Sequence, residues 1–369
     1  MTHKQSEYES LLSQLVNIPS PSTHLTGINK CLALIKKEIS PLKPSTLKII
    51  DSKKSPILIA KKIKKNCTHI LFNIHIDTVF DLNSSFNSYK KKSTNTATGP
   101  GVIDAKGGCV ILLHTLKNIE KENLPISWSV IINSDEEIGT PYSKKTLISH
   151  AKEADIGIVF EPCLENGDFI DERPVSSNIC IKSKGKEAHA GRHPEKGINA
   201  IHHLIKFLST IQDIIPDTMT LNIGTINGGV KENIIPGYAE AKLNCRCFNE
   251  KHYTSFLKQL NDIAKKHKQK FDASITVHEE TFRPSNPLTS KKKKLFELLK
   301  SCGKELNTPI KTRSSFGVCD GNILASAGIP VIDTFGPLGK GMHTEKESIH
   351  LPSLIQKIDL ITHFIKAII

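Results

Sequence analysis

The sequence predicts a two-domain α/β fold, with a central mixed, mostly parallel sheet and a smaller inserted α+β domain. The first sign is a set of apolar runs without polar alternation, at residues 68–76, 128–132 and 156–160. Such runs suit strands that are covered on both faces, as in parallel sheets. The second sign is length, because 369 residues exceed the usual limit of one hydrophobic core.

The first domain is expected to begin with residues 1–172, in which strand and helix segments alternate up to Glu161. The composition then changes at residues 164–168, which form a polar stretch with a glycine, and we expect a hinge there. The chain is expected to return to this domain at residues 287–369, after a linker with two prolines. The predicted helix, strand and final helix of this returning part are residues 291–299, 330–334 and 351–368.

The inserted domain is expected at residues 173–286. Its predicted elements follow the order β-α-β-β-α-β, which is the ferredoxin-like pattern, within about 110 residues. In that order they are residues 178–184, 197–215, 219–226, 239–248, 250–268 and 273–280.

Acidic and histidine residues stand at the ends of several apolar runs. They are His75, Asp104, Glu137, Glu161 and His343. In open parallel sheets the strand ends meet at one crevice, so distant segments can converge there. Carboxylates brought that close repel one another unless a cation lies among them. Two histidines and three carboxylates suit zinc, and with one shared carboxylate they suffice for two ions about 3.5–4 Å apart.

Each of these residues also has a simpler interpretation. His75 and Asp77 form a His-x-Asp pair, which is often a surface pair or an internal hydrogen bond. Asp104 could cap the helix that is expected near Lys106, and residues 135–137 could form a solvated acidic turn. The metal interpretation therefore depends on all the segments together.

Five segments resemble the signature blocks of a large metallohydrolase family. This family includes acetylornithine deacetylase, succinyl-diaminopimelate desuccinylase, aminoacylases and bacterial glutamate carboxypeptidases. The resemblance extends from residue 11 to the C-terminal helix, and the segments occur in the family's order. They are IHIDTV (74–79), GPGVIDAKGG (99–108), DEEIG (135–139), FEP (160–162) and GMHTE (341–345).

The resemblance implies a metallopeptidase-type first domain with two divalent ions, most simply zinc, with cobalt or manganese as alternatives. It implies that Asp104 bridges both ions, that His75 and Glu161 complete one shell, and that Glu137 and His343 complete the other.

It further implies that Asp77 orients His75, as a carboxylate often does beside a metal-bound imidazole. Glu136 is then available for proton transfer and matches the general base of the family. A carboxylate in that position can take a proton from water and pass it to the leaving amine.

The inserted domain carries further family-like blocks, at residues 185–194 and 222–237. The resemblance implies a homodimer in which His189 reaches into the partner subunit's site and polarises the scissile carbonyl. The alternative for His189 is a polar loop residue. Arg246 matches an arginine that meets the substrate carboxylate, and Asn233 is a further candidate for substrate binding. The alternative for Arg246 is a position on a solvated strand face, and the alternative for Asn233 is a side chain that closes a turn before Pro236.

Residues 313–322 and 328–339 look most like the glutamate carboxypeptidase branch. In that branch an arginine near the position of Arg313 helps to hold the acidic side chain of the substrate. Here the spacing from Arg313 to Asp320 is one residue longer than in that branch.

Composition sets weaker limits. The formal net charge of +13 and the lysine runs could indicate nucleic-acid binding. However, aromatic residues make up only 5% of the chain and the sequence contains no nucleic-acid-binding module, so we interpret the runs as solvated faces. The positive field would favour anionic substrates. The nine cysteines are expected to be reduced. With no apolar stretch that could span a bilayer, we expect no membrane partner and a cytoplasmic protein.

Together these observations predict a dinuclear metal-dependent hydrolase that cleaves an amide bond to an amino acid with a free carboxylate, in the manner of a glutamate carboxypeptidase. The alternative is an N-acyl amino acid deacylase, such as acetylornithine deacetylase or succinyl-diaminopimelate desuccinylase. A non-catalytic binding protein is the third interpretation.

Overall fold

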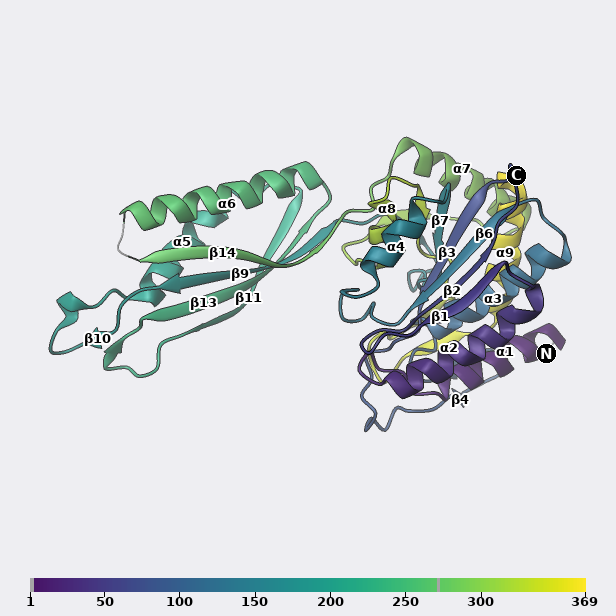
Figure 1. Ribbon diagram of the computed structural model, residues 1–369, viewed down its shortest axis with the longest axis horizontal. Helices are drawn as coiled ribbons and strands as arrows, with labels where there is room; N and C mark the ends of the chain where they lie inside the picture. The colour runs from purple at the N-terminus through teal and green to yellow at the C-terminus, as the bar shows by residue number, and fades with distance from the viewer. Residues whose placement is uncertain (1–2, 271–272) are drawn as a thin grey trace. The chain divides into compact units, whose positions relative to one another are not determined.

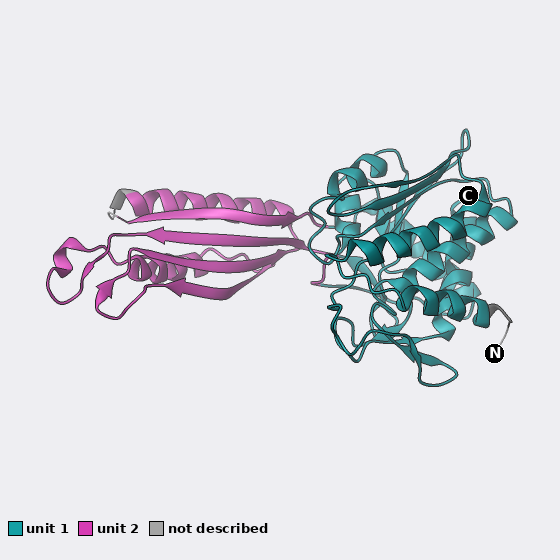
Figure 2. Ribbon diagram, turned by 60° about the horizontal axis from the view of Figure 1, so that its bottom comes forward, with its two compact units in different colours: residues 1–172, 286–315, 319–369 teal, residues 173–285, 316–318 magenta. Residues whose placement is uncertain are grey.

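The computed structural model describes residues 3–270 and 273–369. It divides into two compact units (Figure 2). Unit 1 comprises Met1–Glu172, Asn286–Ser315 and Cys319–Ile369, and unit 2 comprises Arg173–Ser285 and Phe316–Val318. The second unit therefore interrupts the first.

Unit 1 is built on a six-stranded sheet with the order β1-β2-β6-β3-β7-β16 (Figure 1). The central strand β3 pairs in parallel with β6 and β7, and β16 pairs in parallel with β7. Strands β1 and β2 form an antiparallel edge. The predicted mixed, mostly parallel sheet is thus confirmed. Its strands are Thr46–Ile50 (β1), Ile57–Lys62 (β2), His69–His75 (β3), Ser127–Asn133 (β6), Ile156–Val159 (β7) and Val331–Ile332 (β16).

Both faces of this sheet are covered by helices. Along β3, Ile70 and Phe72 enter the core beneath one group of helices, whereas Leu71 enters a smaller core on the other face. Every residue of β6 is buried, which suits the mostly apolar run at residues 128–132. The larger core involves α1 (His3–Val16), α2 (Leu25–Ile39), α3 (Lys106–Lys121), α7 (Ser290–Glu305) and α9 (Pro352–Ile368), and the smaller one α4 (Lys144–Ala151) and α8 (Asp320–Ala325).

Smaller elements complete unit 1. A four-stranded sheet has the order β17-β18-β5-β4, and β15 pairs in parallel with β8. A single 3-10 turn, Ser40–Leu42, follows α2. The strands are Lys90–Lys91 (β4), Thr96–Thr98 (β5), Phe169–Glu172 (β8), Thr312–Ser314 (β15), Gly339–Lys340 (β17) and Ser348–His350 (β18).

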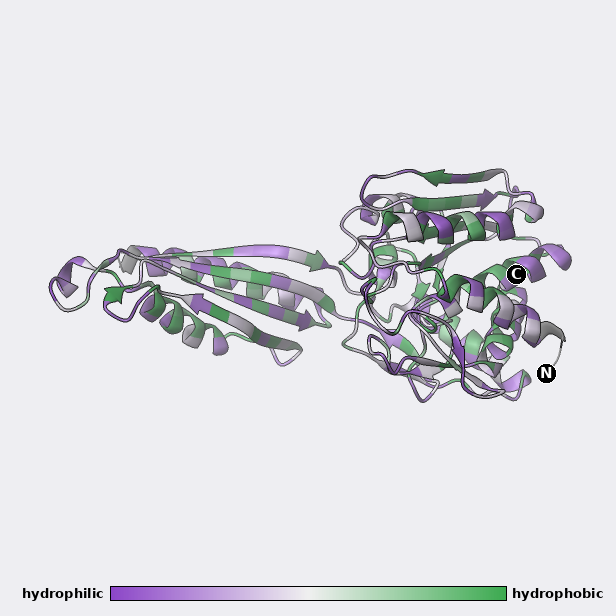
Figure 3. Ribbon diagram, turned by 90° about the horizontal axis from the view of Figure 1, so that it is seen from below, coloured by the Kyte–Doolittle hydropathy of each residue, from purple (hydrophilic) through white to green (hydrophobic). Residues whose placement is uncertain are grey.

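Unit 2 has the predicted order β-α-β-β-α-β, and its four main strands form an antiparallel sheet with the order β11-β13-β9-β14. Hydrophobic and hydrophilic residues alternate along these strands (Figure 3), and alternate residues of β13 face the two helices. Cys245 and Cys247 share that buried face, and all nine cysteines are free thiols. The elements are Val175–Lys184 (β9), Ala200–Gln212 (α5), Met219–Gly228 (β11), Tyr238–Cys247 (β13), Glu250–Lys270 (α6) and Ser274–Arg283 (β14).

The prediction of a hinge at residues 164–168 is wrong. Leu164–Asp168 is a closed turn within unit 1, in which Leu164 N donates to Asp168 O (3.1 Å) and Gly167 N donates to Leu164 O (2.7 Å). The chain continues from this turn into β8 and passes to unit 2 after Glu172. A polar turn and a hinge have the same local composition, so the sequence cannot distinguish them. The pairing of β8 with β15 shows that the turn belongs to unit 1.

Within the described ranges, no helix combines the length and the apolar character needed to cross a membrane.

Candidate metal centre

The five predicted metal ligands come together in unit 1. His75 is the last residue of β3, and Glu137 and Glu161 follow the ends of β6 and β7. Asp104 lies two residues before α3 and is joined to Ala105 by a cis peptide bond, and His343 lies in the loop between β17 and β18. The parallel strand ends thus deliver three of the side chains to one edge of the sheet, as expected for this class of fold.

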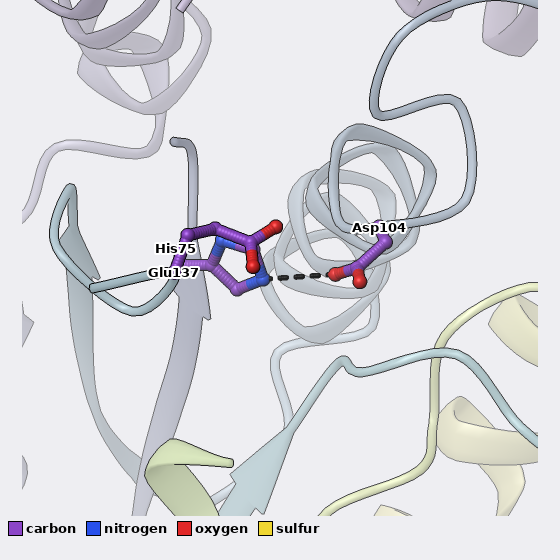
Figure 4. A group of neighbouring side chains, drawn as sticks. All are labelled: His75, Asp104 and Glu137. Atoms are coloured by element: carbon purple, nitrogen blue, oxygen red, sulfur yellow. Dashed lines mark hydrogen bonds and ion pairs between the residues drawn. The ribbon is translucent and has the colours of Figure 1, made fainter. Parts of the chain in front are cut away.

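Asp104 lies between the two histidines. Its Oδ1 is 3.0 Å from His75 Nε2, and its Oδ2 is 3.0 Å from His343 Nε2. Figure 4 shows the side chains of His75, Asp104 and Glu137 pointing toward one another, and one potential ligand atom from each lies within 4.8 Å of the others. A single carboxylate therefore connects both halves of the cluster.

Each histidine also has a glutamate of its own. His75 Nε2 lies 3.7 Å from Glu161 Oε1, and His343 Nε2 lies 3.4 Å from Glu137 Oε2. The cluster consequently has two halves, each with one imidazole, one glutamate and one oxygen of Asp104. The family resemblance predicts one ion for each half.

The electrostatics of the cluster follow from its burial. Burial lowers the pKa of His75, but Glu161, Asp104 and Asp77 outweigh it and raise that pKa well above the ordinary value. Hydrogen bonds to Asp104 and Glu137 raise the pKa of His343 to about 10. Burial raises the pKa of Glu137 to about 7. Positive charge is thus strongly favoured at this place, whether it comes as protons or as a cation.

The donor set fits a divalent metal. Imidazole and carboxylate groups are zinc ligands, and atoms bound at about 2.1 Å in a tetrahedral shell lie about 3.4 Å apart. The nitrogen-to-oxygen distances of 3.0, 3.4 and 3.7 Å are close to that separation. Glu137 Oε1, moreover, is buried without a hydrogen-bond partner among the described residues, which leaves an acceptor available to a cation.

Asp77 contacts the nitrogen of His75 that does not face Asp104. His75 Nδ1 lies 3.1 Å from the backbone oxygen of Asp77 and 3.3 Å from its Oδ1, so this nitrogen donates to Asp77 and Nε2 is left to face Asp104. The carboxylate of Asp77 also accepts from Ser22 Oγ (2.7 Å) and Glu137 N (3.1 Å). Asp77 therefore fixes both the ring of His75 and the backbone at Glu137.

Glu347 is a residue that the sequence analysis missed. Its buried carboxylate accepts from Gly101 N (2.9 Å), Ile103 N (2.8 Å) and Asp104 N (3.1 Å), and so it holds the loop that carries Asp104. Burial raises the pKa of Glu347 to about 7. In the sequence, the only sign of its role is its position four residues after His343. The neighbouring residues do not distinguish Glu347 from an ordinary solvent-exposed glutamate.

The simpler interpretations of the acidic residues do not describe this structure. Ala105 is the N-cap of α3 and no side chain caps that helix, so Asp104 is not a capping residue. Residues 135–137 do not form a solvated turn, because Asp135 is buried and accepts from Tyr142 N (2.7 Å), Ser143 N (2.9 Å) and Ser143 Oγ. Asp135 thereby anchors the loop that follows β6.

The predicted residues of the inserted domain lie in unit 2. His189 belongs to the short strand β10 (Ala188–His189), which pairs with β12 (Ile234–Ile235). Ala190 N donates to Asn233 O (3.0 Å), so the segment of Asn233 lies beside that of His189. Arg246, on β13, donates through Nη1 to Phe316 O (2.9 Å).

Arg313 lies in unit 1, but its recorded contacts are not with the cluster. Its Nε and Nη2 lie 2.9 and 2.7 Å from Asp168 Oδ2. The sequence could not show this pairing, because the two residues are 145 positions apart.

Asp77→Asn is expected to weaken metal affinity about 10- to 100-fold, because outer carboxylates of this kind fix the orientation of a metal-bound imidazole. The measurement is a competition with a coloured chelator on purified protein. Asp51→Asn, at an exposed position, is the matched control. Unchanged affinity in the Asp77 variant would show that Asp77 does not support the site.

Metal uptake near pH 7 is expected to release protons. The pKa of His343 is about 10 without metal, so this ring is protonated at neutral pH and must lose its proton to bind an ion. Apparent affinity should therefore rise as the pH increases toward that pKa and fall on acidification. Calorimetry in buffers of different ionisation enthalpy counts the protons, and His343→Ala should release fewer. An affinity that does not change with pH would contradict this.

The chain is similar to several known proteins. Residues 175–272 match the peptidase dimerisation domain family. Over nearly the whole chain, the protein is similar to carboxypeptidase G2 of Pseudomonas sp. (strain RS-16), with 26% identity over 94% of this chain and 85% of that one. It is also similar to succinyl-diaminopimelate desuccinylase of Pelagibacter ubique, with 26% identity over 97% of each chain.

Among solved structures, aminopeptidase PepT of Bacillus cereus has the same fold, with a TM-score of 0.79, 20% identity and coverage of 99% of this chain and 98% of that one. The sequence matches and the solved structure agree on the fold of the chain. Residues 175–272 thus match a peptidase dimerisation domain, and the chain as a whole is similar to carboxypeptidase G2 and to succinyl-diaminopimelate desuccinylase.

Proposed function

We propose that this protein is a zinc-dependent hydrolase with two metal ions that cleaves an amide bond to an amino acid with a free carboxylate. The observation that carries the proposal is the position of Asp104, whose two oxygens each face a different histidine. A bridging carboxylate with one histidine and one glutamate on each side is a donor set for two ions rather than one. Cobalt or manganese are the alternatives to zinc.

His75 and Glu161 would hold one ion and Glu137 and His343 the other, with Asp104 shared between them. Ions bound there would supply Lewis acidity and would make water acidic enough to react near neutral pH.

Glu136 is the proposed general base. Its backbone N–H lies 3.3 Å from Asp77 Oδ1, and the neighbouring Glu137 N also donates to Asp77, so the same carboxylate fixes the backbone of both glutamates. The Glu136 side chain is half-buried. It would take a proton from the attacking water and pass it to the leaving amine, a role that typically contributes about 10²–10⁴-fold to the rate.

His189 is the proposed donor to the oxyanion. Its Nδ1 accepts from Gly191 N and Arg192 N, each at 3.2 Å, which places the ring proton of the neutral imidazole on Nε2. That N–H can donate to a developing negative charge. The match to a dimerisation domain supports a homodimer in which the partner subunit's His189 serves each metal centre.

Arg246 is the proposed anchor for the free carboxylate of the substrate, with Asn233 as an additional polar contact. Burial lowers the pKa of Arg246, as does the nearby charge of Arg283. An anionic ligand would offset both effects. Arg313 is not included among these contacts, because its guanidinium is bonded to Asp168.

The proposed substrate is a peptide-like glutamyl conjugate, as in carboxypeptidases. A pocket of about 620 Å³ beside His343, lined in part by Val79 and Phe80, could receive the substituent on the other side of the bond. The second candidate is an N-acyl amino acid, and the similarity to a desuccinylase at the same identity favours it. Release of amine from a panel of glutamyl conjugates and of N-acetyl and N-succinyl amino acids decides between them.

Glu136→Gln is expected to lower kcat by about 10²–10⁴-fold while the metal content stays the same, because the amide cannot accept the proton. Glu297→Gln, an exposed position on α7, is the control. The measurements are initial rates on the best substrate of the panel and elemental analysis of the same samples. If the Glu136 variant kept full activity, the proton would have to pass through another group.

Mixing two inactive variants tests the shared site. His189→Ala and Glu136→Gln subunits are unfolded together and refolded as mixed dimers. If the partner subunit's His189 serves each centre, one of the two sites in a mixed dimer has both residues intact, and activity should return. If His189 acts within its own subunit, the mixture should stay as inactive as the separate variants.

A further inference from the structure

Unit 1 contains a second pocket of about 420 Å³, which lies among the turn after β7, the segment before β15 and helix α9. It is lined by residues such as Cys163, Ile310 and Lys357, and none of the five cluster side chains is among its lining residues. Its volume is in the range of pockets that bind small organic molecules.

Lys357 gives this pocket an unusual charge. The residue is 8% exposed, and its Nζ lies 3.9 Å from the centre of the Phe169 ring. Burial lowers the pKa of Lys357, and among the described residues only the thiol of Cys163 raises it. An aromatic ring offsets only part of the cost of burying an ammonium without an anion.

The carboxylate in the pocket wall does not neutralise Lys357. Asp168 Oδ2 accepts from Asn166 Nδ2 (2.8 Å) and is paired with Arg313 through Nε and Nη2. Lys311 adds a further cation at the rim. The lining thus has three cations and one carboxylate, and that carboxylate already has its partner.

The remaining lining is mostly apolar. Phe169, Ile310 and Leu360 form hydrophobic wall next to the buried ammonium. A ligand that fits must therefore combine one negative group with an apolar body. We propose that this pocket is a second small-molecule site, separate from the metal cluster, which binds an organic carboxylate with Lys357 as its counter-ion.

The test is calorimetric titration of the full-length protein with phenylacetate, in metal-loaded and metal-free form. One molecule per chain should bind in both forms. Lys357→Met should weaken binding at least about tenfold, because a charge-assisted hydrogen bond is lost. Lys366→Met, on the same helix but outside the pocket, should bind as the unmodified protein does.

Two further ligands make the result independent of the variants. Phenylacetamide, which has the same shape without the charge, should bind the unmodified protein at least about tenfold more weakly than phenylacetate. Inorganic phosphate, which has charge without an apolar body, should not displace phenylacetate at equal concentration. The thermal midpoint of Lys357→Met should rise without ligand, because a buried ammonium with no carboxylate partner is replaced by an apolar chain of similar volume.

Three results would overturn the proposal. Binding that disappears with the metal but survives Lys357→Met would place phenylacetate on the metal cluster. Equal affinity for the acid and the amide would show that Lys357 is not a counter-ion. Displacement by phosphate would show that the pocket accepts any small anion.

Discussion

The metal centre depends on the position of one carboxylate, that of Asp104, between His75 and His343. Asp104 stays there because Glu347 accepts three backbone N–H groups from the loop that carries it. Glu347 lies four residues beyond His343, so one short segment supplies a histidine and also fixes the carboxylate that faces it. A buried residue outside the cluster therefore determines the geometry of the cluster.

The same arrangement explains why so much charge can be buried. Each histidine lies near Asp104 and one glutamate, and Asp77 in addition holds the outer nitrogen of His75 and the backbone of the loop after β6. Without positive charge these groups would repel one another or retain protons. Protons and metal ions compete for the same donor atoms, which ties metal affinity to pH through the residues that position the metal.

The inserted unit separates the segments of the centre along the chain without disturbing them. His75 to Glu161 precede the insertion and His343 follows it, because the chain leaves unit 1 after Glu172 and returns at Asn286. Unit 2 has a core of its own, formed by its sheet and two helices. It carries His189, whose Nδ1 accepts from two backbone N–H groups, and Arg246, which lies on a strand of its sheet.

Much of this could be predicted from the sequence, because the signals are local. The apolar runs of β3, β6 and β7, the order of elements in unit 2 and the acidic or histidine residues at strand ends all depend on neighbouring positions. Tertiary structure decided the rest: which oxygen of Asp104 faces which histidine, the burial of Glu347, the pairing of Arg313 with Asp168, and the turn where a hinge was expected. These features join residues up to 246 positions apart, and their partners are set by packing rather than by periodicity. A local pattern can show that a charge is present, but only the packed chain determines what it faces.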